Sequence, residues 1–205
     1  MKTTAREIEE IKSFWKWFLT HCNDFGEKFE NEKLINELDE RILDLGDFVW
    51  EIGPGVEQDN MLVISPGGDP DLLEKTKEII SYSTSCKGWE FYYSKPPKEW
   101  DLTFIFQKDN GDEIEIDGAR WQYILLKFDD GMFKAIFKAP GLSTLSVDER
   151  LTVAEIILDG ILGEEFRILT IEEIDIVDDF EDQYTSRIND ISILKKHLKQ
   201  LTDRQ

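Results

Sequence analysis

The fold is decided by the stretch Cys86-Lys87-Gly88-Trp89-Glu90-Phe91-Tyr92-Tyr93-Ser94-Lys95-Pro96-Pro97-Lys98-Glu99-Trp100. Five aromatic side chains lie between Gly88 and Trp100, and a double proline interrupts the run. Because a central strand cannot continue through proline, the sequence predicts a strand over residues 89–94. Side chains alternate along a strand, so Trp89 and Phe91 are expected on one face and Tyr92 on the other.

Length and composition favour a globular protein with one main domain. The chain has 205 residues, of which 40% are hydrophobic and 12% aromatic, so it can bury a sizeable core. We expect residues 1–184 to form a single α+β domain that includes the N-terminal helices. Residues 185–205 are expected to form a C-terminal amphipathic helix.

The formal charge of −20 is the strongest departure from an average composition. Nucleic-acid binding needs lysine and arginine against phosphate, so a charge of this sign argues against it. The same charge fits a basic protein partner, because opposite charges speed association. The alternative is that the charge serves solubility alone.

The two cysteines, Cys22 and Cys86, are too few and too isolated for a disulfide framework or a metal cluster. We therefore expect reduced thiols and a cytoplasmic location. The first residues contain no apolar stretch typical of a signal peptide, and no run approaches the ~18 apolar residues of a membrane span. The sequence thus predicts a soluble protein that does not bind a membrane.

Hydrophobic periodicity and turn residues predict the order of helices and strands. Helices are expected over residues 4–21, 32–45, 70–82, 147–161 and 185–203. Strands are expected over residues 48–52, 61–65, 89–94, 102–107, 113–117, 120–128, 132–138 and 166–177. The loop at residues 53–60 is long enough to move, which leaves open whether it acts as a lid.

The order strand, strand, helix, strand occurs twice, over residues 48–94 and 121–176. From this repeat we predict an α+β fold in which two ββαβ-like halves build one largely antiparallel sheet. Helices are expected to cover a face of that sheet, with further helices at the N- and C-termini.

The C-terminal segment differs in charge from the rest of the chain. Its basic residues outnumber its acidic residues by three: Arg187, Lys195, Lys196, Lys199 and Arg204 against Asp190 and Asp203. An apolar stripe along the same segment predicts that it docks on the acidic body. A homodimer formed through residues 185–203 is the alternative.

No motif predicts catalysis, a cofactor or a metal ion. His21 and His197 lie near opposite ends of the chain, and neither adjoins a clear nucleophile in the sequence. The acids Glu113, Glu115 and Asp117 are expected on the solvent side of a hairpin. We therefore predict no catalytic residue, no cofactor and no metal ligand.

Candidate partner-binding residues lie in the central stretch and in the loop at residues 53–60. Aromatic side chains with polar tips are favoured at binding surfaces, and the double proline makes the neighbouring turn rigid. The predicted contacts are Tyr92, Lys95, Lys98, Trp100, Glu57 and Asp59. Trp89, Phe91 and Trp121 are assigned to the core.

A resemblance to known proteins rests on short strings. Gly88-Trp89-Glu90-Phe91 ahead of Lys95-Pro96-Pro97, preceded by Ile64-Ser65-Pro66-Gly67-Gly68 and a helix, resembles uncharacterised bacterial proteins of unknown function. The resemblance covers residues 48–138 and implies no catalytic residue and no cofactor. Some small acidic bacterial proteins of this appearance are immunity proteins that neutralise a toxin, which is an analogy of size and charge.

These observations favour a non-enzymatic, acidic, cytoplasmic binding protein, such as an immunity or inhibitor protein that recognises a basic protein partner. The alternative is a small hydrolase or transferase that works through carboxylates. That alternative predicts a concave pocket holding acidic groups with raised pKa values.

Overall fold

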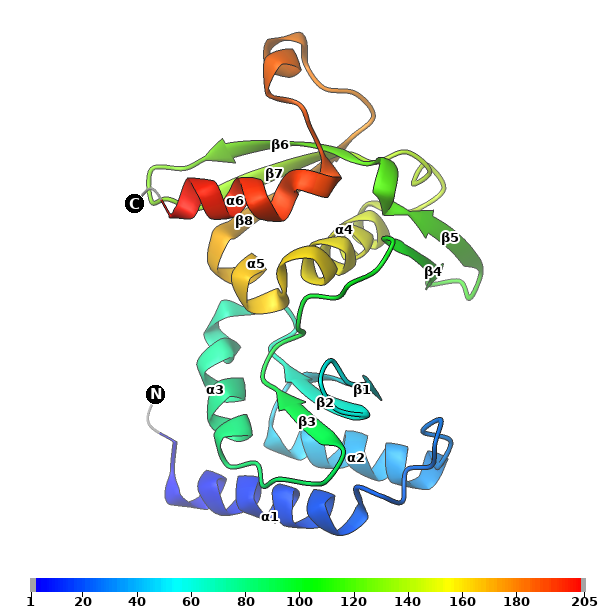
Figure 1. Ribbon diagram of the computed structural model, residues 1–205, viewed down its shortest axis with the longest axis vertical. Helices are drawn as coiled ribbons and strands as arrows, with labels where there is room; N and C mark the ends of the chain where they lie inside the picture. Colours follow the sequence, from blue (N-terminus) through cyan, green and yellow to red (C-terminus); the bar gives the residue numbers. More distant parts are fainter. Residues whose placement is uncertain (1–2, 204–205) are drawn as a thin grey trace. The chain divides into compact units, whose positions relative to one another are not determined.

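The computed structural model describes residues 3–203 and divides the chain into two compact units, residues 1–95 and 96–205 (Figure 1). The boundary falls at the double proline, a composition typical of the links between compact units. It differs from the division at residue 184 that the sequence suggested. The C-terminal helix is part of the second unit, because its apolar side chains belong to the core of that unit.

The first unit has the order helix, helix, strand, strand, helix, strand. Its elements are α1 (Ala5–His21), α2 (Glu32–Leu45), β1 (Val49–Pro54), β2 (Asn60–Ser65), α3 (Pro70–Ser81) and β3 (Trp89–Tyr92). β1 and β2 form an antiparallel hairpin, and β3 adds parallel to β2. These bounds agree with the predicted elements to within a few residues.

An aromatic core joins the helices of the first unit to its sheet. The ring centroids of Phe18 on α1 and Trp89 on β3 lie 5.1 Å apart, edge to face, and those of Trp15 and Phe91 lie 4.8 Å apart. The indole of Trp15 also donates a hydrogen bond of 2.7 Å to the carbonyl of Ile79 in α3. Fully burying one phenylalanine contributes about 1.5–3 kcal/mol, so these rings stabilise the unit strongly. The predicted core position of Trp89 is confirmed, and Phe91 is half-buried against the same core.

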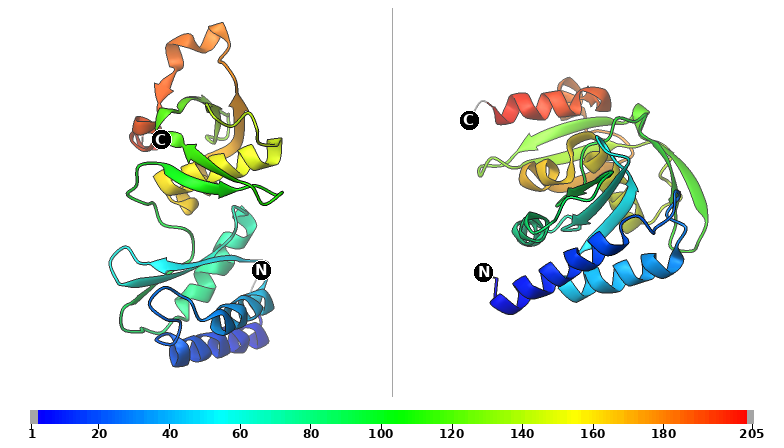
Figure 2. Two further views of the ribbon diagram at one scale, coloured as in Figure 1. Left: turned by 90° about the vertical axis from the view of Figure 1, so that its right-hand side faces the viewer. Right: turned by 60° about the horizontal axis from the view of Figure 1, so that its bottom comes forward.

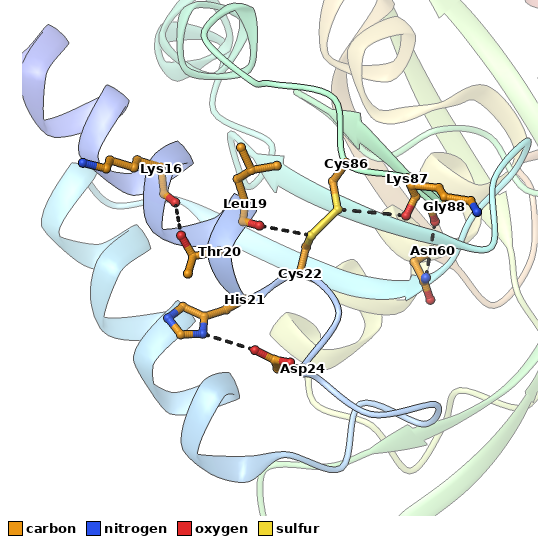
Figure 3. The surroundings of a disulfide bond; sticks show 10 residues. All are labelled: Lys16, Leu19, Thr20, His21, Cys22, Asp24, Asn60, Cys86, Lys87 and Gly88. Atoms are coloured by element: carbon orange, nitrogen blue, oxygen red, sulfur yellow. Dashed lines mark hydrogen bonds and ion pairs between the residues drawn. A yellow bond between two sulfur atoms is a disulfide. The ribbon is translucent and has the colours of Figure 1, made fainter.

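Cys22 and Cys86 form a disulfide bond in the first unit, which corrects the prediction of reduced thiols (Figure 3). Cys22 follows the last residue of α1, and Cys86 lies just before β3; both are buried. Their separation of 64 residues hid the pairing, because only the folded chain brings β3 back to α1. Disulfides are rare in reducing compartments, so the bond weighs against the expected cytoplasmic location.

Over residues 96–203, the second unit contains two sheets. Its elements are β4 (Thr103–Gln107), β5 (Glu113–Asp117), η1 (Gly118–Arg120), β6 (Gln122–Lys127), β7 (Phe133–Lys138), α4 (Val147–Leu162), α5 (Glu164–Thr170), β8 (Ile171–Val177), η2 (Asp182–Arg187), β9 (Asn189–Asp190), η3 (Ile191–Ile193) and α6 (Leu194–Thr202). One sheet has the strand order β8-β7-β6-β9, and β4 pairs with β5 in the other.

The predicted ββαβ repeat is present, once in each unit. β6 and β7 are antiparallel and β8 runs parallel to β7, just as β1, β2 and β3 do. The α+β class and the predominance of antiparallel pairs are confirmed. The halves do not share one sheet, however, because the strands within residues 3–203 form three separate sheets and no strand of one half pairs with a strand of the other.

Two segments differ from the predicted elements. The strand expected from Phe166 begins at Ile171, because residues 164–170 form helix α5. Glu164 and Glu165 lie in the first turn of α5, where the helix dipole favours negative charge. The C-terminal α-helix begins at Leu194 and not at residue 185, since short 3-10 turns and β9 occupy residues 182–193.

The apolar stripe of the C-terminal segment is buried within the second unit, as docking on the body predicted. Ile191, Leu194 and Leu198 belong to the same core as Trp121, whose predicted burial is also confirmed. Figure 2 shows α6 (red) running alongside the light green strands β6 and β7. A homodimer through residues 185–203 would require these side chains to leave the core.

Within the part of the chain that the structure describes, no helix is both long and apolar enough to cross a membrane.

Candidate functional site

The hairpin of β1 and β2 ends in residues 55–59, which we call the acidic loop. The tip of the loop is exposed, and Val56 leaves 63% of its surface open to solvent. Glu57, Gln58 and Asp59 beside it are exposed as well. The loop therefore presents one apolar side chain next to two carboxylates.

The carboxylate of Glu90 on β3 holds the acidic loop in place. It accepts hydrogen bonds from the backbone amides of Val56 and Glu57, and the Glu57 amide lies 3.2 Å and 3.1 Å from its two oxygens. Successive amides aimed at one anion form a nest, and hydrogen bonds to a charged acceptor are stronger than neutral ones. The loop is thus fastened to the neighbouring strand by its main chain, which leaves its side chains available.

Gly55 permits this close approach. A Cβ at Gly55 would lie 2.6 Å from Oε1 of Glu90 and 2.5 Å from the carbonyl oxygen of Gln58. Both distances are shorter than van der Waals contact, so any side chain here would force the loop away from Glu90. The second glycine of Gly53-Pro54-Gly55 therefore has a positional role and not only a turn-forming one.

A second attachment lies at the other end of the acidic loop. The backbone and side-chain amides of Asn60 both donate to the carbonyl of Gly88, at 2.9 Å and 3.3 Å (Figure 3). Gly88 belongs to the turn that starts at Cys86, so the disulfide holds the same turn against α1. The loop that the sequence left open as a lid is fastened at both ends.

Tyr92 follows Glu90 on the same face of β3 and is half-buried. Burial raises the pKa of the Tyr92 hydroxyl, and the negative charges of Glu90 and Glu57 raise it further. A hydrogen bond that the Tyr92 hydroxyl donates to Glu90 acts in the same direction, so the hydroxyl keeps its proton near neutral pH and its oxygen can still accept a hydrogen bond. Tyr92, Glu57 and Asp59, all proposed from sequence, thus belong to the region around the acidic loop.

The other three predicted contacts lie elsewhere along the chain. Lys95 is the last residue of the first unit and is half-buried. Lys98 belongs to the second unit, where its backbone amide donates to the carbonyl of Gly160 in α4 at 2.8 Å. Trp100 packs against the same glycine so closely that a Cβ there would lie 2.4 Å from its ring. Trp100 is therefore a packing residue within the second unit.

The sequence pattern did not indicate Glu90 as a site residue. Alternation placed it opposite Trp89 and Phe91, on a face where a carboxylate usually meets only solvent. The available signal was an acid in the middle of an aromatic strand together with a glycine-rich loop one strand away. Neither feature alone indicates that the carboxylate turns towards the main chain of the loop.

Each of the two histidines contacts one partner side chain of its own unit. Nδ1 of His21 lies 3.5 Å from the carboxylate of Asp24, and Nδ1 of His197 lies 2.8 Å from the hydroxyl of Tyr123. Burial raises the pKa of Tyr123 to about 12, so this hydroxyl is not an activated nucleophile. Among the described residues, no group of three His, Cys, Asp or Glu side chains is placed to hold a metal ion.

A polar pocket lies along α2. Its volume is about 490 Å³, and its lining is Lys33, Asn36, Glu37, Glu40, Arg41 and Asp44. The guanidinium of Arg41 contacts Glu37 at 2.8 Å and holds the pKa of Glu37 below its usual value through a hydrogen bond. A general acid needs a raised pKa, so this carboxyl group has the opposite of the property that the hydrolase alternative requires.

The chain matches no family model, no curated protein and no solved structure at a significant level. The resemblance to uncharacterised bacterial proteins stays a prediction.

Proposed function

We propose that the protein is a non-enzymatic binding protein that recognises a basic protein partner through the acidic loop. The observation that carries this proposal is the carboxylate of Glu90 between the backbone amides of Val56 and Glu57. A loop that is already ordered loses little conformational entropy on binding, so more of its contact energy becomes affinity. The backbone amides of the loop bind Glu90, so its side chains remain available to contact the partner.

The side chains of the loop favour a partner surface with an apolar pocket and basic residues around it. Val56 supplies the exposed apolar side chain of the loop and would enter such a pocket. Glu57 and Asp59 would meet lysine or arginine at the rim, where opposite charges speed encounter and make it salt-sensitive. The hydroxyl oxygen of Tyr92 would accept a hydrogen bond from such a lysine or arginine. Lys95, Lys98 and Trp100 remain predicted contacts that the acidic loop does not need.

An immunity or inhibitor protein that neutralises a basic toxin is the form of this proposal that size and charge favour. A cytoplasmic location belongs to that hypothesis, whereas the disulfide favours an oxidising compartment. Thiol titration of the protein isolated from its host, without added reductant, decides between the two. Two reactive thiols support the cytoplasm, and none supports an oxidising compartment.

A charge-reversal pair tests the proposed function. The wild-type chain, the double variant E57K/D59K and the control E27K/D47K are immobilised, and host extract is passed over each at ~50 mM and ~500 mM salt. Glu27 and Asp47 are exposed acids of the same unit, so the control makes the same change in charge at another place. We expect one basic protein to bind the wild type and the control at low salt only, and E57K/D59K to lose it.

Two results would count against the proposal. One is the absence of a bound basic protein at either salt concentration. The other is an equal loss of binding in E57K/D59K and E27K/D47K, because that would assign the effect to net charge and not to the acidic loop.

A further inference from the structure

The strands β4 and β5 form a two-stranded sheet on the second unit, separate from its four-stranded sheet (Figure 1). One face of this small sheet packs against the core of the unit through Phe104, Phe106, Ile114 and Ile116. The other face is exposed, and Ile105 at its centre leaves 59% of its surface open to solvent. Within residues 3–203, no third strand pairs with β4 or β5.

The hydrogen bonds at the two ends of the hairpin fix which backbone groups point away from β4. The amide of Lys108 donates to the carbonyl of Asp112 at 2.8 Å, and the amide of Gly118 donates to the carbonyl of Leu102 at 2.9 Å. Because hydrogen-bonded pairs alternate along antiparallel strands, the odd-numbered residues of β5 direct their amides and carbonyls outward. The open edge of β5 is thus formed by the main chain of Glu113, Glu115 and Asp117.

Two of these residues, Glu113 and Glu115, carry uncompensated charge. On β4, the positions opposite Glu113 and Glu115 are Gln107 and Ile105, which are neutral. In the described chain, neither carboxylate of Glu113 and Glu115 has an ion pair or a side-chain hydrogen bond. Asp117 differs, because Arg120 contacts it at 2.8 Å.

The acidic strand β8 provides the contrast. There Lys134 of the neighbouring strand β7 reaches Glu173 at 2.9 Å and Asp175 at 2.7 Å. Within the described residues, a basic cross-strand partner is thus present for Glu173 and Asp175 of β8 and absent for Glu113 and Glu115. Opposite charges across a strand pair are stabilising and like charges are destabilising, so a second copy of β5 is a poor partner for this edge.

We propose that the open edge of β5 binds an extended peptide segment that carries lysine or arginine at alternate positions. The segment would add as a third strand: its main chain would bond to the outward amides and carbonyls, and its basic side chains would lie beside Glu113 and Glu115. The residues between the basic ones would face the side of Ile114 and Ile116 and should be apolar. This site lies on the second unit, and it does not rest on the acidic loop.

Two synthetic peptides of identical composition test the proposal on the full chain. One alternates lysine and valine, and the other carries the same lysines and valines in two separate blocks; the ends of both are neutralised. We expect saturation with the alternating peptide to slow amide hydrogen exchange at Glu113 and Glu115 by about tenfold or more, because bonded amides are protected. The block peptide should leave these amides unchanged, since charge alone does not form a strand.

Matched variants identify the surface. E113K/E115K should weaken binding of the alternating peptide by about tenfold, because two attractive cross-strand pairs become repulsive. The control E99K/D178K makes the same change in charge at exposed positions of the same unit and should bind like the wild type. E115P removes an outward backbone amide without breaking a hydrogen bond to β4, and this variant should not bind the peptide. E115Q keeps that amide and should retain most of the binding affinity.

Three outcomes would overturn the proposal. The first is unchanged exchange at Glu113 and Glu115 in the presence of saturating alternating peptide. The second is equal affinity for the two peptides, which would reduce the effect to net charge. The third is loss of peptide binding in E57K/D59K with full binding in E113K/E115K, which would move the site to the acidic loop.

Discussion

Both units contain a ββαβ segment whose three strands pair in the same way, with an additional helix, α5, before the last strand in the second unit, yet different interactions stabilise them. The first unit packs aromatic rings between its helices and its sheet, and a disulfide connects α1 to the turn before β3. The second unit packs mostly aliphatic side chains, and a buried ion pair connects α4 to α5. The comparison shows that the same strand pairing can be stabilised by different kinds of interaction. The first unit has the disulfide between Cys22 and Cys86, and the second unit has the ion pair between Arg167 and Asp159.

The buried ion pair gives the largest expected effect. Nε of Arg167 lies 2.5 Å from Oδ1 of Asp159, and each side chain is only 7% exposed. Arg167→Met leaves the carboxylate of Asp159 buried without this partner, so we expect the second unit to lose about 3–5 kcal/mol. Urea unfolding with amide hydrogen exchange, measured separately for the two units, checks the size and place of the loss.

The double variant R167M/D159L is the control, because replacing both charges with apolar groups is often close to neutral. A loss in R167M below about 1 kcal/mol, within the range of exposed pairs, would show that the pair does not stabilise the second unit as a buried one does.

The disulfide gives the next largest effect. Replacing both cysteines in C22A/C86A removes a crosslink between residues that are 64 positions apart. In the chain-entropy description, a closed loop of that length stabilises the folded state by about 4 kcal/mol. We expect urea unfolding to show this loss in the first unit only, and wild-type protein in a dithiol reductant to match the variant. Equal stability of the variant and the oxidised wild type would remove the contrast between the units.

The smallest effect concerns the capping boxes at the beginning of α1 in the first unit and of α4 in the second. Thr4 with Glu7 begins α1, and Ser146 with Glu149 begins α4. The hydrogen bond from the backbone amide of Thr4 and further bonds from its hydroxyl and from Lys75 lower the pKa of Glu7 to about 2. The bond from the backbone amide of Ser146 likewise lowers the pKa of Glu149.

A lowered folded-state pKa means that the contribution to stability is complete above the ordinary value of 4.5 and is lost as the pH falls towards about 2. We expect the first turn of α1 to fray over that interval. An NMR titration of the Glu7 carboxyl measures this directly, and Thr4→Ala should return its pKa towards the ordinary value. A wild-type Glu7 that titrates near 4.5 would contradict the capping box.

Elements whose signal is local were predictable from the sequence. Asp69 caps α3 with Pro70 in its first turn, and Ser146 with Glu149 begins α4, as the residue types indicated. The hairpin at Asp109-Asn110-Gly111-Asp112 also follows from turn chemistry. Each of these features depends on residues a few positions apart.

Features that depend on distant residues were not predictable. The disulfide and the contact of Glu90 with the acidic loop each join segments that lie far apart in sequence. The separation of the sheets likewise depends on which distant strands pair with each other. The repeat in element order was visible, but nothing in it indicated whether the two halves would pair with each other. For the site, the sequence indicated Tyr92, Glu57 and Asp59 by residue type, and it gave no sign of the side chain that holds the loop.

The contact between Glu90 and the acidic loop is the claim on which the account depends most. Amide hydrogen exchange at Val56 and Glu57, compared between the wild type and Glu90→Ala, tests it without any partner. We predict that both amides are protected in the wild type and exchange at least about tenfold faster in the variant, while the amides of α1 remain unchanged. Equal exchange rates in the two proteins would contradict a loop held by Glu90.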